Sequence, residues 1–400
     1  MVHYRDLQET IMKDVCIFID VPYGIGGVFQ FNQQILSALL TLPGDRYKLT
    51  VFYVEDAWTD LIPAPVEKVK VQYPNFLKSL FKVLFTIGTP NRIMRLLYSL
   101  TPLNQLNNSR FSLVIFPSQD LAGLFLSKHA VNVVYDLMHR YEKQFKESSS
   151  HGRGKFRDRL FGTMAKYSQL ILVDSNVGKK QMIESYNAEP DNVEPLPYIA
   201  PAHIIEYKDE EHVQFFNKLN LPPAFIFYPA QYWPHKNHKI LLEATNVLKK
   251  KIKDFHLVFT GPKRYAYDEL YQYCVDNDLT NNVTFLDYAP NEVLGGFYLR
   301  ARAMVMPTFY GPTNIPPLEA IALGCPVAVS NIYGMPEQLG DASLYFDNTN
   351  IDDVVGVLEK LWVDSALRKQ LKQNSLMHHR NWNQRTFNTR VLDIVSRYAK

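Results

Sequence analysis

Ten short apolar segments, each followed by a turn signal and then a helical pattern, constrain the fold of this chain most strongly. Five lie in the first half and five in the second: "VCIFID" from Val15, "LTVFYV" from Leu49, "LVIF" from Leu113, "VNVVYD" from Val131, "LILVD" from Leu170, "FIFYP" from Phe225, "HLVFT" from His256, "VTFL" from Val283, "AMVMP" from Ala303 and "PVAVS" from Pro326. Continuous apolar runs between helices are typical of parallel strands covered on both faces. The pattern predicts an α/β protein with two doubly wound sheets.

The length of 400 residues suits two domains rather than one core. Prolines and then a charge cluster interrupt the periodicity from about Pro195 to His212, as a linker would. We therefore expect one domain over residues 1–203 and a second over residues 204–380.

Composition and charge exclude several classes of protein. Lys+Arg 43 against Asp+Glu 40 gives a net charge of +3, too balanced for a nucleic-acid binder. Cys16, Cys274 and Cys325 are far apart and show no metal-ligand spacing, so we expect buried thiols in a reducing cytoplasm. The charged start "MVHYRDLQETIMKD" and the lack of a long apolar run predict neither a signal peptide nor a membrane span.

Three loops after predicted strands carry the candidate functional residues. In "DVPYGIGGVFQ", Gly24, Gly26 and Gly27 can bring the backbone close to a phosphate at the start of a helix, although a tight turn also needs glycine. In "YWPHKNHKILLEA", Lys236 precedes an amphipathic helix and can add a charge to its anion-binding end. The alternative is a solvated polar cap.

The third loop, "YGPTNIPPLEA", places two prolines in the first turn of a helix that Gly324 ends. Glu319 then lies about one turn into the helix, where its carboxylate can accept hydrogen bonds from a diol. The alternative is an acid that only complements the helix dipole.

Together with "PHKN" and "GPTNIPPLEAIALGCPVAVS", the looser "GIGG", "DLMHRYEKQF" and "LVDSNVGKK" make nearly the whole chain resemble the retaining glycosyltransferases of family 4. This resemblance implies the GT-B fold, two Rossmann-like domains facing across a cleft. It also implies a nucleotide-diphosphate sugar bound mainly by the second domain, an acceptor bound mainly by the first, and a final helix over residues 381–400 that crosses back to the first domain.

The resemblance assigns roles to individual residues. It implies that Lys236 contacts the diphosphate, that Glu319 binds the ribose hydroxyls, and that Gly26 and Gly27 approach the diphosphate from across the cleft. The donor-binding candidates are Gly26, Gly27, Gln231, Lys236, Asn237, Gly311, Thr313, Asn314, Ile315 and Glu319. No metal or other cofactor is expected, because lysine, amide groups and helix termini can stabilise the leaving diphosphate, and no Asp-x-Asp motif follows a strand.

Three positions depart from the family pattern. Gly311 stands where a sugar-contacting glutamate is common, which leaves sugar recognition to Thr313, Asn314 and backbone groups. Gln231 stands where an arginine is common. Tyr135 replaces a histidine directly before Asp136.

On the acceptor side we therefore consider Tyr135, Asp136 and His139, although His139 could be only a helix-start residue. The catalytic candidates are Asp136, His139, Lys236 and Glu319.

Two further segments carry hypotheses. Residues 76–103 mix apolar side chains with Lys78, Lys82, Arg92 and Arg95, which could lie on an anionic membrane or form ordinary core helices. Residues 139–159 are polar and basic and predict a mobile loop beside the cleft, which could order over the acceptor or simply be solvated.

The expected function is transfer of a sugar to a glycan or lipid-linked glycan acceptor in the synthesis of a surface polysaccharide of O-antigen or capsule type. The expected location is the cytoplasm, with peripheral contact to the inner face of the membrane. The alternatives are a nucleotide-sugar epimerase or hydrolase of the same fold, or a catalytically silent binding homologue.

Overall fold

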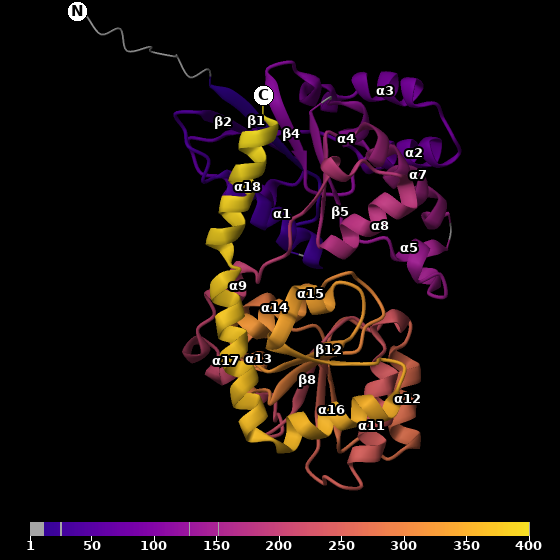
Figure 1. Cartoon of the computed structure of the whole chain (residues 1–400), viewed down its shortest axis with the longest axis vertical. Helices are drawn as coiled ribbons and strands as arrows, with labels where there is room; N and C mark the ends of the chain where they lie inside the picture. The colour runs from indigo at the N-terminus through magenta and orange to yellow at the C-terminus, as the bar shows by residue number, and fades with distance from the viewer. Residues whose placement is uncertain (1–11, 25, 128, 151, 400) are drawn as a thin grey trace, which may run out of the picture.

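The computed structural model describes residues 12–399 except Ile25, Lys128 and His151, so most of "MVHYRDLQETIMKD" lies outside the described residues. The described chain forms two α/β domains, one above the other in Figure 1, connected through α9 (Ala202–Ile205). The prediction of two doubly wound parallel sheets is confirmed.

The sheet of the first domain has seven parallel strands in the order β3-β2-β1-β4-β5-β6-β7. The strands are β1 (Lys13–Ile19), β2 (Tyr47–Tyr53), β3 (Glu67–Lys70), β4 (Phe111–Phe116), β5 (Ala130–Val134), β6 (Leu170–Val173) and β7 (Val193–Pro195). The order reverses beside β1, and a reversal of this kind places the carboxyl ends of β1 and β4 at a ligand-binding crevice.

The sheet of the second domain has six parallel strands in the order β10-β9-β8-β11-β12-β13. The strands are β8 (Ile226–Pro229), β9 (Leu257–Thr260), β10 (Val283–Leu286), β11 (Ala303–Met306), β12 (Val327–Ser330) and β13 (Ser343–Phe346). Each of the ten apolar runs coincides with one strand. The three strands without such a run, β3, β7 and β13, lie at sheet edges.

The helices cover both sheets. In the first domain they are α1 (Gly26–Leu39), α2 (Asn75–Thr86), α3 (Asn91–Ser99), α4 (Ala122–Phe125), α5 (Met138–Tyr141), α6 (Lys146–Ser149), α7 (Arg153–Tyr167) and α8 (Asn176–Tyr186). After α9 they are α10 (Val213–Lys218), α11 (His238–Leu248), α12 (Tyr267–Asp276), α13 (Asn291–Arg300), α14 (Ile315–Ala322), α15 (Met335–Leu339), α16 (Ile351–Val363), α17 (Ser365–Asn381) and α18 (Gln384–Tyr398).

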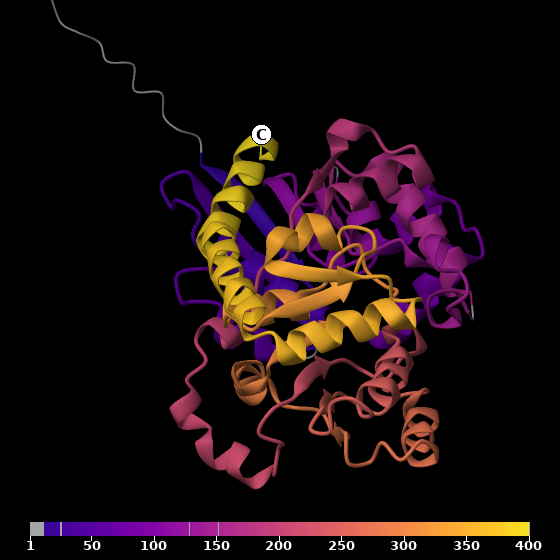
Figure 2. The ribbon, with the colours of Figure 1, turned by 60° about the horizontal axis from the view of Figure 1, so that its bottom comes forward.

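The last helix connects the two domains. While α17 packs against α14 of the second domain, α18 lies along α1 of the first, and Figures 1 and 2 both show this course. Phe387 on α18 is fully buried and its ring lies 6.3 Å from that of Phe31. The Trp382 indole donates a hydrogen bond to the Tyr198 carbonyl at 2.9 Å.

The prediction of a loop over residues 139–159 is wrong for most of the segment. It contains α5, α6 and the start of α7. Contacts with the second domain hold it, because the Phe145 ring lies 5.1 Å from that of Phe309 and the Tyr310 hydroxyl donates to Ser148 Oγ at 2.7 Å.

The segment over residues 76–103 is only partly core. α2 and α3 bury Phe81, Phe85, Met94 and Tyr98 but expose seven large apolar side chains: Phe76, Leu80, Val83, Ile87, Ile93, Leu96 and Leu100. Within the described part of the chain, no helix combines the length and apolarity that crossing a membrane requires. All three cysteines are buried and free, as predicted.

Candidate functional site

A cavity of about 520 Å³ lies between the two domains, lined by residues of both. The first domain contributes the start of α1 and the residues after β5. The second contributes the loops after β8, β9 and β10 and the start of α14. This location beyond the carboxyl ends of parallel strands is where doubly wound sheets bind ligands.

Two helix N-termini meet at this cavity. α1 begins at Gly26, whose φ of +72° is strained for other residues. A Cβ on Gly27 would lie 3.2 Å from Cδ1 of Ile315, the first residue of α14. The free N–H groups at the start of α1 and the positive dipole ends of both helices favour an anion in the cavity. α14 adds few N–H groups, because Pro316 and Pro317 in its first turn have none.

Lys236 brings a cation to the same cavity. Proline begins the short 3-10 helix Pro234–Lys236, and the buried Tyr228 hydroxyl donates to the Lys236 carbonyl at 2.9 Å. Burial lowers the pKa of Lys236 to about 8, opposed in part by Asp136. A bound anion would restore its charged form.

Glu319 lies one turn into α14, as predicted, with 3% of its surface exposed. The Tyr298 hydroxyl donates to Glu319 Oε2 at 2.7 Å, and the Gln30 side chain also hydrogen-bonds this carboxyl from the first domain. Burial raises the pKa of Glu319 to about 7, while both hydrogen bonds lower it. The carboxyl is therefore held by Tyr298 and Gln30 and lines a cavity where its remaining acceptor capacity can bind a diol.

The polar side chains of Thr313 and Asn314 line the cavity, but their donor groups already make hydrogen bonds to other groups of the protein. Thr313 Oγ1 donates to Asp174 Oδ2 of the first domain at 2.5 Å. Asn314 Nδ2 donates to the Tyr310 carbonyl at 3.1 Å, and its backbone pairs with Gln338. These side chains retain acceptor capacity toward a ligand, while their donors shape the loop.

The structure explains why glycine occupies position 311. Gly311 has φ +89°, and a Cβ there would lie 2.6 Å from the Thr313 carbonyl oxygen. This loop shape therefore disfavours a carboxylate side chain at that position. Gly311 does not line the cavity.

The other two donor-side candidates differ in position. Gln231 lines the cavity, and its Oε1 accepts a hydrogen bond from Trp233 Nε1 at 2.9 Å. Asn237 does not line it. Asn237 has a left-handed backbone with φ +55° and donates to the Asn348 carbonyl at 2.9 Å, which connects the Lys236 turn to the loop after β13.

The three acceptor-side candidates lie in two different places. Tyr135 and Asp136 line the cavity; the Tyr135 hydroxyl donates to the Pro117 carbonyl, and Asp136 Oδ1 accepts from Arg157 at 2.6 Å. His139 does not line it.

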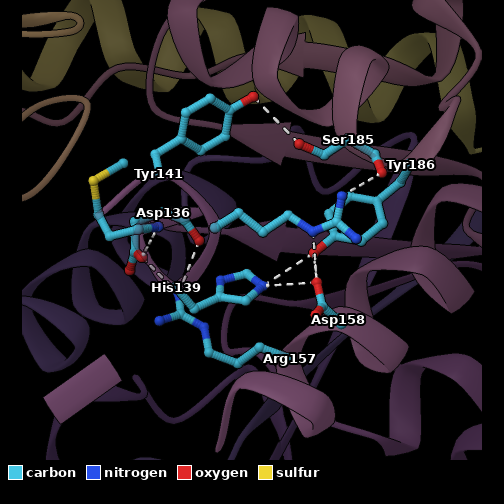
Figure 3. A network of polar contacts seen from close by, with 9 residues as sticks. Asp136, His139, Tyr141, Arg157, Asp158, Ser185 and Tyr186 are labelled. Atoms are coloured by element: carbon cyan, nitrogen blue, oxygen red, sulfur yellow. Dashed lines mark hydrogen bonds and ion pairs between the residues drawn. The ribbon is translucent and has the colours of Figure 1, made fainter. Parts of the chain in front are cut away.

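Figure 3 shows the His139 ring turned to Tyr186 and Asp158, with the Asp136–Arg157 pair close by; its Nε2 lies 3.1 Å from the Tyr186 hydroxyl and 3.3 Å from Asp158 Oδ1. Burial, followed by the charge of Arg157, lowers the pKa of His139 to about 4. His139 is therefore neutral at neutral pH.

Sequence reasoning missed several residues that complete this site. Gln30, Tyr298 and Asp174 act through contacts across the fold that no local motif signals, whereas Arg264 follows β9 and its loop position could have identified it. Among the described residues, no group of three or more His, Cys, Asp or Glu side chains is arranged to hold a metal ion.

These domains and this interdomain cavity define the GT-B glycosyltransferase fold, which comparison with solved structures confirms. A structure of HepE from Anabaena with UDP and glucose superposes with a TM-score of 0.71 at 14% identity, covering 96% of this chain and 99% of that one. WaaG, described as a glycosyltransferase of lipopolysaccharide biosynthesis, gives a TM-score of 0.69 at 14% identity, covering 95% and 99%. Identity this low shows the fold alone.

Sequence comparison defines the second domain further: residues 209–377 match the family "Glycosyl transferases group 1". O-antigen chain mannosyltransferase B of Escherichia coli is 27% identical over 228 residues, covering 55% of this chain and 60% of the relative. O-antigen chain mannosyltransferase RfbU of Salmonella typhimurium is 30% identical over 200 residues, half of each chain. The alignments thus span little more than half of these relatives.

Proposed function

We propose that this protein transfers a sugar from a nucleotide-diphosphate sugar to a glycan or lipid-linked glycan acceptor. One observation carries the proposal: two helix N-termini and Lys236 meet at an interdomain cavity that also contains the Glu319 carboxyl. The helix N-termini and Lys236 suit a diphosphate, and the Glu319 carboxyl suits the hydroxyls of a ribose.

The chemistry follows from where negative charge develops. As the bond to the sugar breaks, the leaving diphosphate gains charge that Lys236, the amides at the start of α1 and the dipole end of α14 stabilise, so the proposed reaction needs no metal. Retention of configuration is part of the proposal, with a phosphate oxygen of the donor accepting the proton of the attacking hydroxyl. The proposal thus includes membership of glycosyltransferase family 4.

The names of the sequence relatives guide the choice of donor and product. Both are described as O-antigen chain mannosyltransferases, so we propose a hexosyl donor, first a mannosyl donor, and a polysaccharide of O-antigen or capsule type. HepE was solved with UDP and glucose, so a glucosyl donor is the second choice.

The decisive experiment incubates purified protein with GDP-mannose or UDP-glucose, with and without a lipid-linked oligosaccharide. We expect release of nucleoside diphosphate that depends on the acceptor, and a product whose new linkage keeps the donor's anomeric configuration. Rapid epimer formation or hydrolysis without acceptor would instead support the epimerase or hydrolase alternative. Binding without turnover of any donor tested would support the silent homologue.

We further propose that α2 and α3 hold the protein peripherally on the inner face of the cytoplasmic membrane. Ile87 and Leu100 are 73% and 77% exposed, and the exposed Arg92 and Arg95 alternate with apolar side chains on α3. Apolar and basic groups together favour an anionic bilayer.

Co-sedimentation with phosphatidylglycerol vesicles tests this proposal. The wild type should bind at low salt, and Leu96→Gln combined with Leu100→Gln should reduce binding. Absence of wild-type binding to these vesicles would exclude the proposed contact.

A further inference from the structure

If Lys236 were the only cation of the donor cavity, it would not balance the negative charge of a bound nucleoside diphosphate. Among the described residues that line the cavity, two are basic, Lys236 and Arg264, and two are acidic, Asp136 and Glu319. Arg157 pairs with Asp136 at 2.6 Å. A nucleoside diphosphate carries at least two negative charges near neutral pH, so one lysine leaves part of that charge unmatched.

The loop that carries Arg264 is fixed against the loop that leads to Lys236. A Cβ on Gly261 would lie 2.2 Å from the Ala230 carbonyl oxygen, so only glycine permits this approach. The Ala266 amide donates to the Tyr232 carbonyl at 3.1 Å. The rings of Tyr265 and Trp233 are 5.1 Å apart. The backbone of Arg264 is therefore held against the loop that leads to Lys236, and both residues line the same cavity.

The Arg264 side chain is free, in contrast to its neighbours. Within the described part of the chain it makes no hydrogen bond or ion pair. Lys263 lies outside the cavity lining, 3.6 Å from Asp287 and 4.7 Å from the Tyr267 ring centroid. Gln231 is neutral, and its side-chain oxygen accepts a hydrogen bond from Trp233.

We propose that Arg264 is the second cation of the donor site and binds the diphosphate of the nucleotide together with Lys236. A guanidinium suits this role because its planar N–H groups can contact two phosphate oxygens at once and it stays charged at any physiological pH. The inference rests on the proposed function, since it concerns the same donor cavity.

The test measures binding of UDP and GDP, and of uridine and guanosine, by isothermal titration calorimetry at 50 and 300 mM salt. The proteins are wild type, Arg264→Gln and Arg264→Lys, with Lys263→Gln as a control that removes the same charge one residue away.

We expect Arg264→Gln to weaken binding of the preferred nucleoside diphosphate by about tenfold or more and to reduce the salt dependence of that binding. Arg264→Lys should retain part of the affinity, and Lys263→Gln should resemble the wild type. Because the Arg264 side chain makes no hydrogen bond or ion pair within the described part of the chain, its variants should unfold at the wild-type temperature.

The outcomes separate the two proposals. If Arg264→Gln and the wild type bind the diphosphate equally, the inference is wrong while the proposed function stands. If Arg264→Gln weakens nucleoside and nucleoside diphosphate by the same factor, Arg264 contacts the base and the inference is also wrong. If the wild type binds none of these nucleotides, the proposed function itself fails.

Discussion

Replacing Glu319 with glutamine should stabilise the free protein while impairing its donor site. The folded chain raises the Glu319 pKa to about 7 from its ordinary value of 4.5, because burial penalises the charged carboxylate. A carboxyl that binds its proton more tightly in the folded state contributes stability that is fully present below pH 4.5 and is lost as pH rises to 7. Between pH 5 and pH 8 this loss amounts to about 2.5 kcal/mol.

Glu319→Gln removes this titration without changing the shape of the side chain, and the Tyr298 hydroxyl can still donate to the amide oxygen. The free energy of unfolding of the variant, relative to wild type, should therefore increase by about 2.5 kcal/mol between pH 5 and pH 8. Asp174, whose pKa burial also raises to about 7, contributes equally to both proteins and cancels in the difference.

The assay is urea unfolding of both proteins at half-unit intervals from pH 5 to pH 8, followed by tryptophan fluorescence. Glu292→Gln on α13 is the control, because this acid is exposed and is hydrated in the folded and unfolded states alike. A difference between Glu319→Gln and wild type that stays constant from pH 5 to pH 8 would show that the Glu319 carboxyl is not proton-bound by burial, and the reasoning would be wrong.

Lys236→Ala and Glu319→Ala should each abolish sugar transfer with little change in circular dichroism, and wild-type rates in both would refute their assigned roles. Nucleoside diphosphate binding should weaken as pH rises through about 8, where free Lys236 loses its proton; a flat profile from pH 7 to pH 9 would argue against Lys236 as a diphosphate ligand. Gly311→Ala should lower the unfolding free energy by roughly 1–3 kcal/mol because its Cβ would contact the Thr313 carbonyl, and an unchanged melting temperature would contradict this.

The central strands of both sheets could be predicted from the sequence, because their residues are buried on both faces and must be apolar throughout. The edge strands β3 and β13 escaped prediction because solvent reaches one side, and "EKVK" and "SLYF" need no continuous apolar run. The segment over residues 139–159 was misjudged because its local composition is polar. Phe145 and Ser148 contact the second domain, and no local pattern signals these contacts.

The sequence by itself determined the positions of Gly26, Lys236 and Glu319 after their strands, because glycine conformation, proline placement and helix starts are local properties. Only the tertiary structure decided which groups share the cavity. It brought Gln30 and Tyr298 to Glu319, joined Asp174 to Thr313, placed Arg264 on the lining of the same cavity as Lys236 and left His139 outside that lining, against Tyr186 and Asp158. These contacts join residues far apart in the chain, and their geometry follows from the packing of two sheets and the helices between them.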